Sequence, residues 1–209
     1  MTDAVRLIVA DDHTLFRQGL KSLLRRRREF QVVAEVERAS ELAQTLASTP
    51  CDVLLLDLQM ERWAIDDIEQ FSAVTKVLVL TASEQTEDAI SALKMGARGI
   101  VQKRFAIETL MLAIRSVAEG LVWIPPMVQT EIAAQWRAPT DKLLTGREFE
   151  IISFVATGLR NAEVGEKLSI SEATVKTHLN NIFHKLALRD RVELTLYAIR
   201  HGLVTASRS

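Results

Sequence analysis

The sequence predicts an α/β domain with a doubly wound parallel sheet, followed by a small all-α domain. First, five short apolar runs alternate with helical segments over the first 120 residues. Second, these runs are almost continuously apolar, as expected for parallel strands that are covered on both faces. Third, the pattern beyond residue 121 contains only helices. The chain is therefore expected to form two units with different architectures.

The strands and helices of the first unit follow one another in regular order. Apolar runs such as RLIVA and VLVLT predict strands at 6–10, 32–36, 53–57, 77–81 and 99–103. Apolar residues at helical spacing predict helices at 14–28, 40–48, 85–95 and 105–119, with a weaker one near 63–72. This alternation predicts a sheet with helices on both faces.

The second unit follows a connecting region. Residues 121–142 contain three of the four prolines and are predicted to form a linker with a short helix at 126–136. Thr145 and Glu148 have the spacing of a capping box, and Asn161 and Ser171 are the expected caps of the next two helices. The helices are expected at 146–157, 162–168, 172–186 and 190–201, with Gly202 just past the last.

Composition limits the class of protein. The chain has 209 residues, 48% hydrophobic and 25% charged, with a formal net charge of −1, which is typical of globular proteins. The sequence has no apolar run of about 18 residues and no signal-peptide pattern at its start, so we expect a cytoplasmic protein without a membrane partner. Cys51 is the only cysteine, which excludes an internal disulfide.

Polar side chains stand where the predicted strands end. Asp11 and Asp12 follow the first strand, Asp57 ends the third, Thr81 ends the fourth and Lys103 ends the fifth. Because ligands of a doubly wound sheet bind at the carboxyl ends of the strands, we expect these side chains to share one site. Three clustered carboxylates require a cation, and hard oxygen ligands without His or Cys favour Mg²⁺.

The chemistry predicted for this site is phosphoryl transfer. A carboxylate beside Mg²⁺ can act as a nucleophile towards phosphorus, and Lys103 and Thr81 could orient the phosphoryl oxygens. The alternative for an Asp pair after a strand is an ordinary turn. A Mg²⁺-dependent phosphatase is a further alternative, but it would normally have a second acidic residue at position 59, where this chain has Gln.

The motifs VADDH, LLLDLQM, VLVLTAS and GARGIVQK resemble, in order and spacing, the receiver domain of bacterial two-component response regulators. The resemblance covers residues 5 to about 120 and implies a flavodoxin-like fold. It implies that a sensor histidine kinase phosphorylates Asp57, and that Thr81 and Lys103 contact the phosphoryl group. It also implies that Mg²⁺ is bound by Asp11, Asp12, Asp57 and the backbone carbonyl of Gln59.

The sequence departs from the pattern of that family in the loop after Asp57 and at Ile100. Receiver domains usually have Met-Pro-Gly after the phosphorylated Asp, whereas this chain has Met60, Glu61, Arg62 and Trp63. The family usually places an aromatic residue three positions before the Lys, and this chain has Ile100 there. The chemistry of the site is therefore expected to be kept, while the response of the domain surface is expected to differ.

A helix-turn-helix pattern spans 161–188, with a short turn at Ser169 and Ile170. One face of the second helix is apolar, and the other is polar and suited to base edges and phosphates. This polar face consists of Thr174, Lys176, Thr177, Asn180, Asn181, His184 and Lys185. From the pattern alone, a helical bundle with a hydrated face is an equally good interpretation.

Residues 143–203 resemble the LuxR/NarL-type DNA-binding domain, through LTxRE, the GLxN turn, ISxxTVKxHLxxI and KL. The resemblance implies that helix 172–186 enters the major groove of double-stranded DNA. The bases would be contacted by Lys176, Thr177 and Asn180, and the phosphates by Thr174 and Lys185. Helix 190–201 would form the contact of a homodimer.

The two resemblances together predict a phosphorylation-dependent transcriptional regulator rather than an enzyme. Its expected parts are a receiver domain at 1–120, a linker at 121–142 and a DNA-binding domain at 143–209. The alternative is a transcription factor that works without phosphorylation, in which the receiver serves for dimerisation or for sensing a ligand. The operator, the kinase and the direction of regulation are not predicted.

Overall fold

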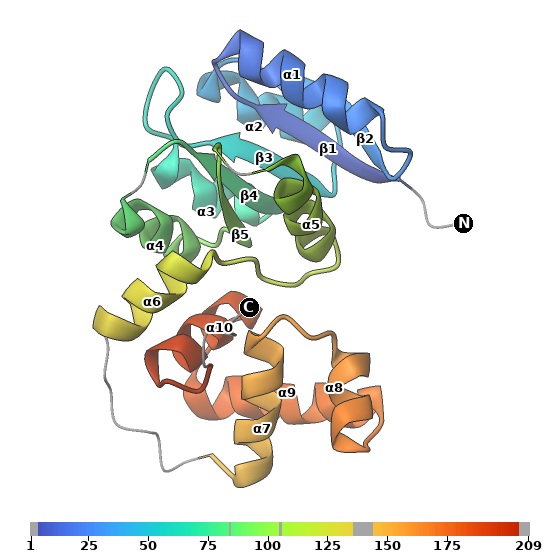
Figure 1. The fold of residues 1–209 in the computed structure, drawn as a ribbon, viewed down its shortest axis with the longest axis vertical. Helices are drawn as coiled ribbons and strands as arrows, with labels where there is room; N and C mark the ends of the chain where they lie inside the picture. The colour runs from blue at the N-terminus through green and yellow to red at the C-terminus, as the bar shows by residue number, and fades with distance from the viewer. Residues whose placement is uncertain (1–3, 84, 105, 136–143, 205–209) are drawn as a thin grey trace. The chain divides into compact units, whose positions relative to one another are not determined.

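The computed structural model describes residues 4–83, 85–104, 106–135 and 144–204. The chain divides into two compact units, Met1–Trp123 and Ile124–Ser209 (Figure 1). Residues 136–142 of the expected linker lie outside the described residues, and its short helix is α6 (Pro126–Gln135). Within the second unit α6 contacts α10 (Arg191–Arg200). The finer division into receiver, linker and DNA-binding domain stays a prediction.

The first unit contains a parallel five-stranded sheet in the order β2-β1-β3-β4-β5. All five strands coincide with the predicted runs to within two residues at each end. They are β1 (Val5–Ala10), β2 (Phe30–Val36), β3 (Val53–Asp57), β4 (Lys76–Thr81) and β5 (Gly99–Gln102). This order is that of flavodoxin-like sheets, so the predicted fold class is confirmed. The switch in strand order falls between β1 and β3.

Helices cover both faces of this sheet (Figure 1). Side chains such as Val9, Leu55 and Val101 pack on one face against α1 (Thr14–Arg25) and α5 (Ile107–Ala118). Residues of the opposite parity, such as Leu54 and Val79, are equally buried. On that face lie α2 (Ala39–Ser48), α3 (Ile68–Ser72) and α4 (Thr86–Lys94), with the 3-10 helix η1 (Ile65–Asp67) before α3.

The end of the first unit runs beside β5. The amide of Ile100 donates to the carbonyl of Trp123 (3.0 Å), and the amide of Trp123 donates to the carbonyl of Arg98 (3.0 Å). A Cβ at Gly99 would lie 2.9–3.0 Å from atoms of Leu78 and Trp123. Glycine is therefore needed at position 99 for the close approach of the Trp123 segment.

The second unit is helical in its described residues and has its own core. Besides α6 and α10 it contains α7 (Gly146–Ala156), α8 (Asn161–Leu168) and α9 (Glu172–Leu186). The capping box of Thr145 and Glu148 and the cap by Ser171 are confirmed, with the Thr174 amide donating to Ser171 Oγ (3.0 Å). The core includes Ile151, Val164, Val175, Leu179 and Ile182.

The expected cap of α8 is wrong. Asn161 is the first helical residue, and the N-cap is Arg160. The Arg160 amide donates to Glu163 Oε2 (2.6 Å), so a side chain from within the helix satisfies the terminus. The Asn161 side chain instead accepts a hydrogen bond at Oδ1 from Arg191 Nη1 (3.3 Å). Asn161 thereby connects the start of α8 to α10.

Candidate functional site

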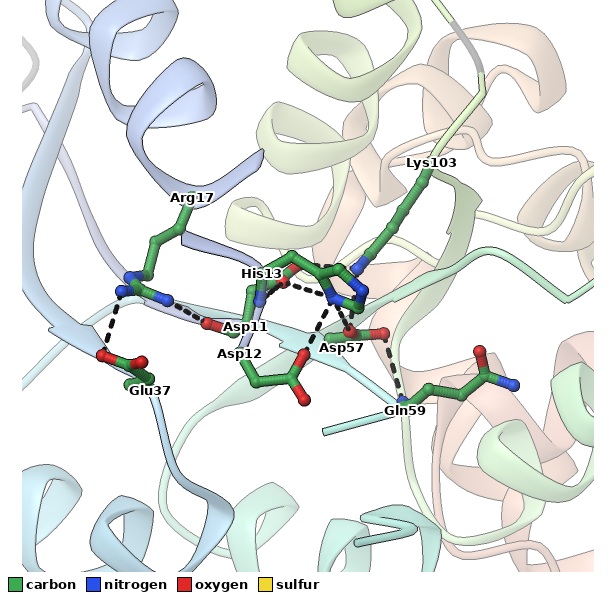
Figure 2. Close-up of polar contacts among 8 residues, drawn as sticks. All are labelled: Asp11, Asp12, His13, Arg17, Glu37, Asp57, Gln59 and Lys103. Atoms are coloured by element: carbon green, nitrogen blue, oxygen red, sulfur yellow. Dashed lines mark hydrogen bonds and ion pairs between the residues drawn. The ribbon is translucent and has the colours of Figure 1, made fainter. Parts of the chain in front are cut away.

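The carboxyl ends of β1, β3 and β5 bring Asp11, Asp57 and Lys103 together (Figure 2). All three continue the residue parity of the face covered by α1 and α5. Lys103 Nζ lies 2.7 Å from Asp57 Oδ2 and 2.7 Å from Asp11 Oδ2. The Asp11 and Asp57 side chains are almost completely buried. One ammonium group thus balances two buried carboxylates.

The environment of Asp57 changes its acidity. Burial raises the pKa of the Asp57 carboxyl above its ordinary value, and the hydrogen bond and charge of Lys103 offset only part of this rise. The main-chain amide of Gln59 donates to Asp57 Oδ1 (3.1 Å). Both carboxylate oxygens are therefore held, one by Lys103 and the other by the loop that follows β3.

Asp12 and His13 complete the cluster. His13 Nδ1 lies 2.8 Å from Asp12 Oδ1, 3.4 Å from Asp11 Oδ1 and 3.8 Å from Asp57 Oδ2. The His13 side chain is 66% exposed, so it lies at the open side of the cluster. Sequence reasoning missed His13, and the only available signal was its position directly after the Asp pair.

The donor set fits Mg²⁺. Ligand atoms of Asp11, Asp12, His13 and Asp57 all lie within 4.8 Å of one another. Three of the four residues supply hard carboxylate oxygens, and Asp12 remains partly exposed, which leaves room for the water ligands that Mg²⁺ keeps. Gln59 approaches Asp57 through its main-chain amide, and the role of its carbonyl as a ligand stays a prediction.

Thr81 ends β4 at the same edge of the sheet. Its carbonyl accepts from the Lys103 amide (2.8 Å), and its hydroxyl oxygen accepts from the Ser83 amide (2.9 Å). Thr81 has the parity opposite to that of Leu80, which faces α1 and α5. Its buried hydroxyl is engaged by the loop after β4, and its predicted contact with a phosphoryl group stays a prediction.

The loop after Asp57 closes without the Pro and Gly that the sequence lacks. The Ala64 amide donates to the Leu58 carbonyl (3.1 Å), and Gln59 and Trp63 form an antiparallel bridge. The positive-φ residues among the described ones all lie outside this loop. Because every residue here adopts ordinary backbone angles, the turn has no conformational need for glycine.

The second candidate site is the exposed face of α9. Val175, Leu179 and Ile182 are buried on the opposite face. All five predicted DNA contacts are exposed, namely Thr174, Lys176, Thr177, Asn180 and Lys185. The helix-turn-helix arrangement predicted from the sequence is confirmed, because α8 contacts α9 across the turn at Ser169.

Several of these side chains already have partners within the unit. Lys176 pairs with Glu172 one turn away (2.8 Å), and Thr177 Oγ1 donates to the Ala173 carbonyl (3.1 Å). Lys185 Nζ donates to both carboxylate oxygens of Glu148 at 2.8 Å. Contact between Lys185 and a phosphate would therefore compete with an ion pair that joins α9 to the start of α7.

Glu148 is buried at this junction. Burial acts to raise the pKa of its carboxyl, but the hydrogen bonds from Lys185 and from the amide and hydroxyl of Thr145 outweigh it, so the pKa is lowered. The carboxylate thus stays charged while it caps α7 and holds α9.

Within the described part of the chain, none of the helices has the length and apolar character to cross a membrane.

Known proteins resemble both units. Residues 7–115 match the family described as Response regulator receiver domain, and residues 142–198 match the Bacterial regulatory proteins, luxR family. The transcriptional regulatory protein LnrK of Bacillus subtilis (strain 168) is 32% identical over 218 residues, covering 95% of this chain and 98% of LnrK. The crystal structure of the response regulator ChrA of a heme-sensing two-component system shares 31% identity with a TM-score of 0.53, covering 97% and 100% of the two chains. A complex of the response regulator RcsB with DNA shares 25% identity with a TM-score of 0.56, covering 93% of this chain and 97% of RcsB.

Proposed function

Because the chain belongs to the two-component response regulators that carry a LuxR-type DNA-binding domain, we propose that phosphorylation of Asp57 controls its binding to double-stranded DNA. Regulation by phosphorylation is typical of this family of transcriptional regulators. The observation that carries the proposal is the buried Asp57 carboxylate at the end of β3, held between Lys103 and the Asp11–Asp12 pair. We infer that the protein acts in the cytoplasm, with a sensor histidine kinase as donor.

The proposed reaction is transfer of one phosphoryl group. An Asp57 oxygen forms a bond to phosphorus as the bond from phosphorus to the donor's leaving atom breaks, giving an acyl phosphate. Mg²⁺ held by Asp11, Asp12, Asp57 and the Gln59 carbonyl would offset the charge of the incoming phosphoryl oxygens. The Lys103 ammonium group is already within hydrogen-bond distance of Asp57 and would donate to an oxygen of the phosphoryl group once it is attached. Thr81 would donate its hydroxyl to a phosphoryl oxygen.

We propose that the exposed face of α9 enters the major groove. Lys176, Thr177 and Asn180 lie on this face and have groups suited to base edges. Thr174 and Lys185 would contact phosphates. A homodimer formed through α10 would place two copies of α9 on paired half-sites, about one helical turn apart.

A second candidate function is transcriptional control without phosphorylation, with the receiver serving for dimerisation or ligand sensing. Ile100 favours this reading, because it is 1% exposed and has neither a ring nor a hydroxyl to move in response to a phosphoryl group. Constitutive dimers, with the same DNA affinity in the Asp57→Asn variant, would support it.

Incubation of the full chain with Mg²⁺ and acetyl phosphate tests the phosphorylation step. We expect an intact mass increased by one phosphoryl group, and no increase in the Asp57→Asn variant. Asn keeps the size of Asp but offers no carboxylate nucleophile. A wild-type chain that gains no phosphoryl group, or an Asp57→Asn variant that gains one equally, would contradict the proposal.

A further inference from the structure

Glu61 occupies the position where a receiver domain usually has Pro, and its side chain contacts the start of α2. Glu61 Oε2 accepts from the Ala39 amide (2.9 Å), and Oε1 accepts from the Ser40 amide (3.3 Å). These are the first two residues of α2, whose N-cap residue Arg38 makes no side-chain cap. Burial acts to raise the pKa of the Glu61 carboxyl, but the Ala39, Ser40 and Glu61 amides and the charge of Arg62 together outweigh it, and the pKa is lowered. Glu61 therefore caps α2 from the loop that follows Asp57.

The same segment of chain also holds the loop after β1. Buried Arg17 of α1 donates through Nη1 to the main-chain carbonyl of Asp11, and through Nη2 to Glu37 Oε2 at 3.3 Å (Figure 2). Glu37 lies two residues before the start of α2. The turn at 37–40 is thus bonded to both loops that carry the carboxylate cluster, through Arg17 on one side and Glu61 on the other.

We propose that Glu61 is a positioning residue for the Mg²⁺ and phosphoryl site, an inference that rests on the proposed function of Asp57. Its bonds to α2 fix the middle of loop 58–64, whose first turn carries the Gln59 amide that contacts Asp57. The Gln59 carbonyl, the predicted metal ligand, belongs to the same loop. The carboxylate of Glu61 supplies by hydrogen bonding the restraint that Pro at this position would supply by fixing its backbone φ angle.

The cap should be visible in the affinity of the full chain for a divalent cation. Binding is measured with Mn²⁺, whose free form is counted by electron paramagnetic resonance, and Mg²⁺ affinity is obtained by competition. We expect Glu61→Ala to weaken both affinities about fivefold, because the cation must then order a loop that Glu61 no longer holds on α2. The lost cap is worth about 1 kcal/mol, which sets the upper size of the effect. Glu61→Gln keeps an oxygen acceptor for the α2 amides and should stay within about twofold of the wild type. Glu69→Ala removes an exposed carboxylate from nearby α3 and should change neither affinity.

The variants separate positioning from charge and from stability. Equal losses in Glu61→Ala and Glu61→Gln would mean that the negative charge attracts the cation, and would overturn the proposal. A lowered thermal midpoint of Glu61→Ala with unchanged cation affinity would assign Glu61 a purely structural role and would also overturn it. If the wild-type chain bound neither cation, the proposed function itself would fail. If the wild type bound the cations and Glu61→Ala bound them equally well, only the positioning role of Glu61 would be wrong.

Discussion

Lys103 is the residue on which the charge balance of the carboxylate site depends. Its ammonium group lies at the same distance, 2.7 Å, from a carboxylate oxygen of Asp11 and one of Asp57, and its side chain is only 13% exposed. Without it, two buried carboxylates would face each other, and the pKa of Asp57 would rise further above its ordinary value.

We expect the Lys103→Met variant to lose about 3 kcal/mol of unfolding free energy, because removal of one partner leaves buried charges uncompensated. Urea denaturation of the full chain at neutral pH, without divalent cations, measures the loss. Adding Asp57→Asn to Lys103→Met removes one of the repelling carboxylates and should recover much of the stability. If the double variant were no more stable than Lys103→Met, charge repulsion would not be the cause.

Part of this site could be predicted residue by residue from the positions where the strands end. Asp11, Asp57 and Lys103 meet because each terminates or follows a buried parallel strand, a relation that sequence alone carries. The contacts of His13 and Glu61 are of another kind. Glu61 accepts a hydrogen bond from the first residue of α2, which lies 22 residues earlier in the chain. The spacing of apolar residues in a sequence cannot predict such a contact between a loop and a distant helix end. The hydrogen bond from the Ser83 amide to the Thr81 hydroxyl oxygen could not be predicted from the sequence either.

Among the helices, the ion pair of Glu148 and Lys185 connects the first turn of α7 to the last turn of α9. A carboxyl whose pKa is lower in the folded than in the unfolded state contributes stability above the unfolded pKa and loses it as pH falls through the folded pKa. Glu148 is of this kind. Its contribution should be complete at neutral pH and should disappear in the acid range below its ordinary value of 4.5.

We expect Glu148→Gln to lower the unfolding free energy by about 1–2 kcal/mol at pH 7, because the Lys185 ammonium and the Thr145 amide lose a charged acceptor. The difference from the wild type should shrink as the pH falls below 4.5. Thermal unfolding of the full chain at a series of pH values, followed by circular dichroism, measures both. Glu150→Gln, which removes an exposed carboxylate of the same helix, should show little effect at any pH. A difference that grew on acidification would contradict the assignment.

Helix ends were predicted less well than helix existence. The helix expected at 14–28 ends at Arg25. The prediction ran three residues too far because the arginines at 26–28 are good helix formers and mark no boundary. The start of α8 was misassigned, since Glu163 competes with Asn161 for the role of cap. At Gly165 within α8, helix propensity alone favours Ala by about 1 kcal/mol, yet a Cβ there would lie 2.7 Å from the Ile170 carbonyl oxygen. The turn between α8 and α9 thus approaches the helix too closely for propensity alone to predict the effect.

For the whole molecule, the alternation of strands and helices was sufficient to predict a parallel sheet and a separate helical unit. The order β2-β1-β3-β4-β5 follows from the chain's resemblance to receiver domains rather than from periodicity, because any right-handed parallel sheet gives the same alternation. What neither source predicts is the coupling between the two units. Asp57 belongs to the first unit and α9 to the second, so a phosphoryl group on Asp57 can affect DNA binding only through a change that extends beyond the receiver unit.

If phosphorylation favours a dimer that engages two half-sites, the phosphodonor should tighten DNA binding by about tenfold, within the usual range of coupling between sites. Fluorescence anisotropy with a duplex selected from random sequence by the full chain, at fixed salt, measures the change with and without acetyl phosphate and Mg²⁺. The Asp57→Asn variant should show no change.

Coupling is reciprocal in binding, so the phosphorylated chain should also dimerise more tightly when the duplex is present. Wild-type chain that is phosphorylated at Asp57 but binds the duplex no more tightly would show that phosphorylation of the receiver does not control DNA binding, and would favour control without phosphorylation.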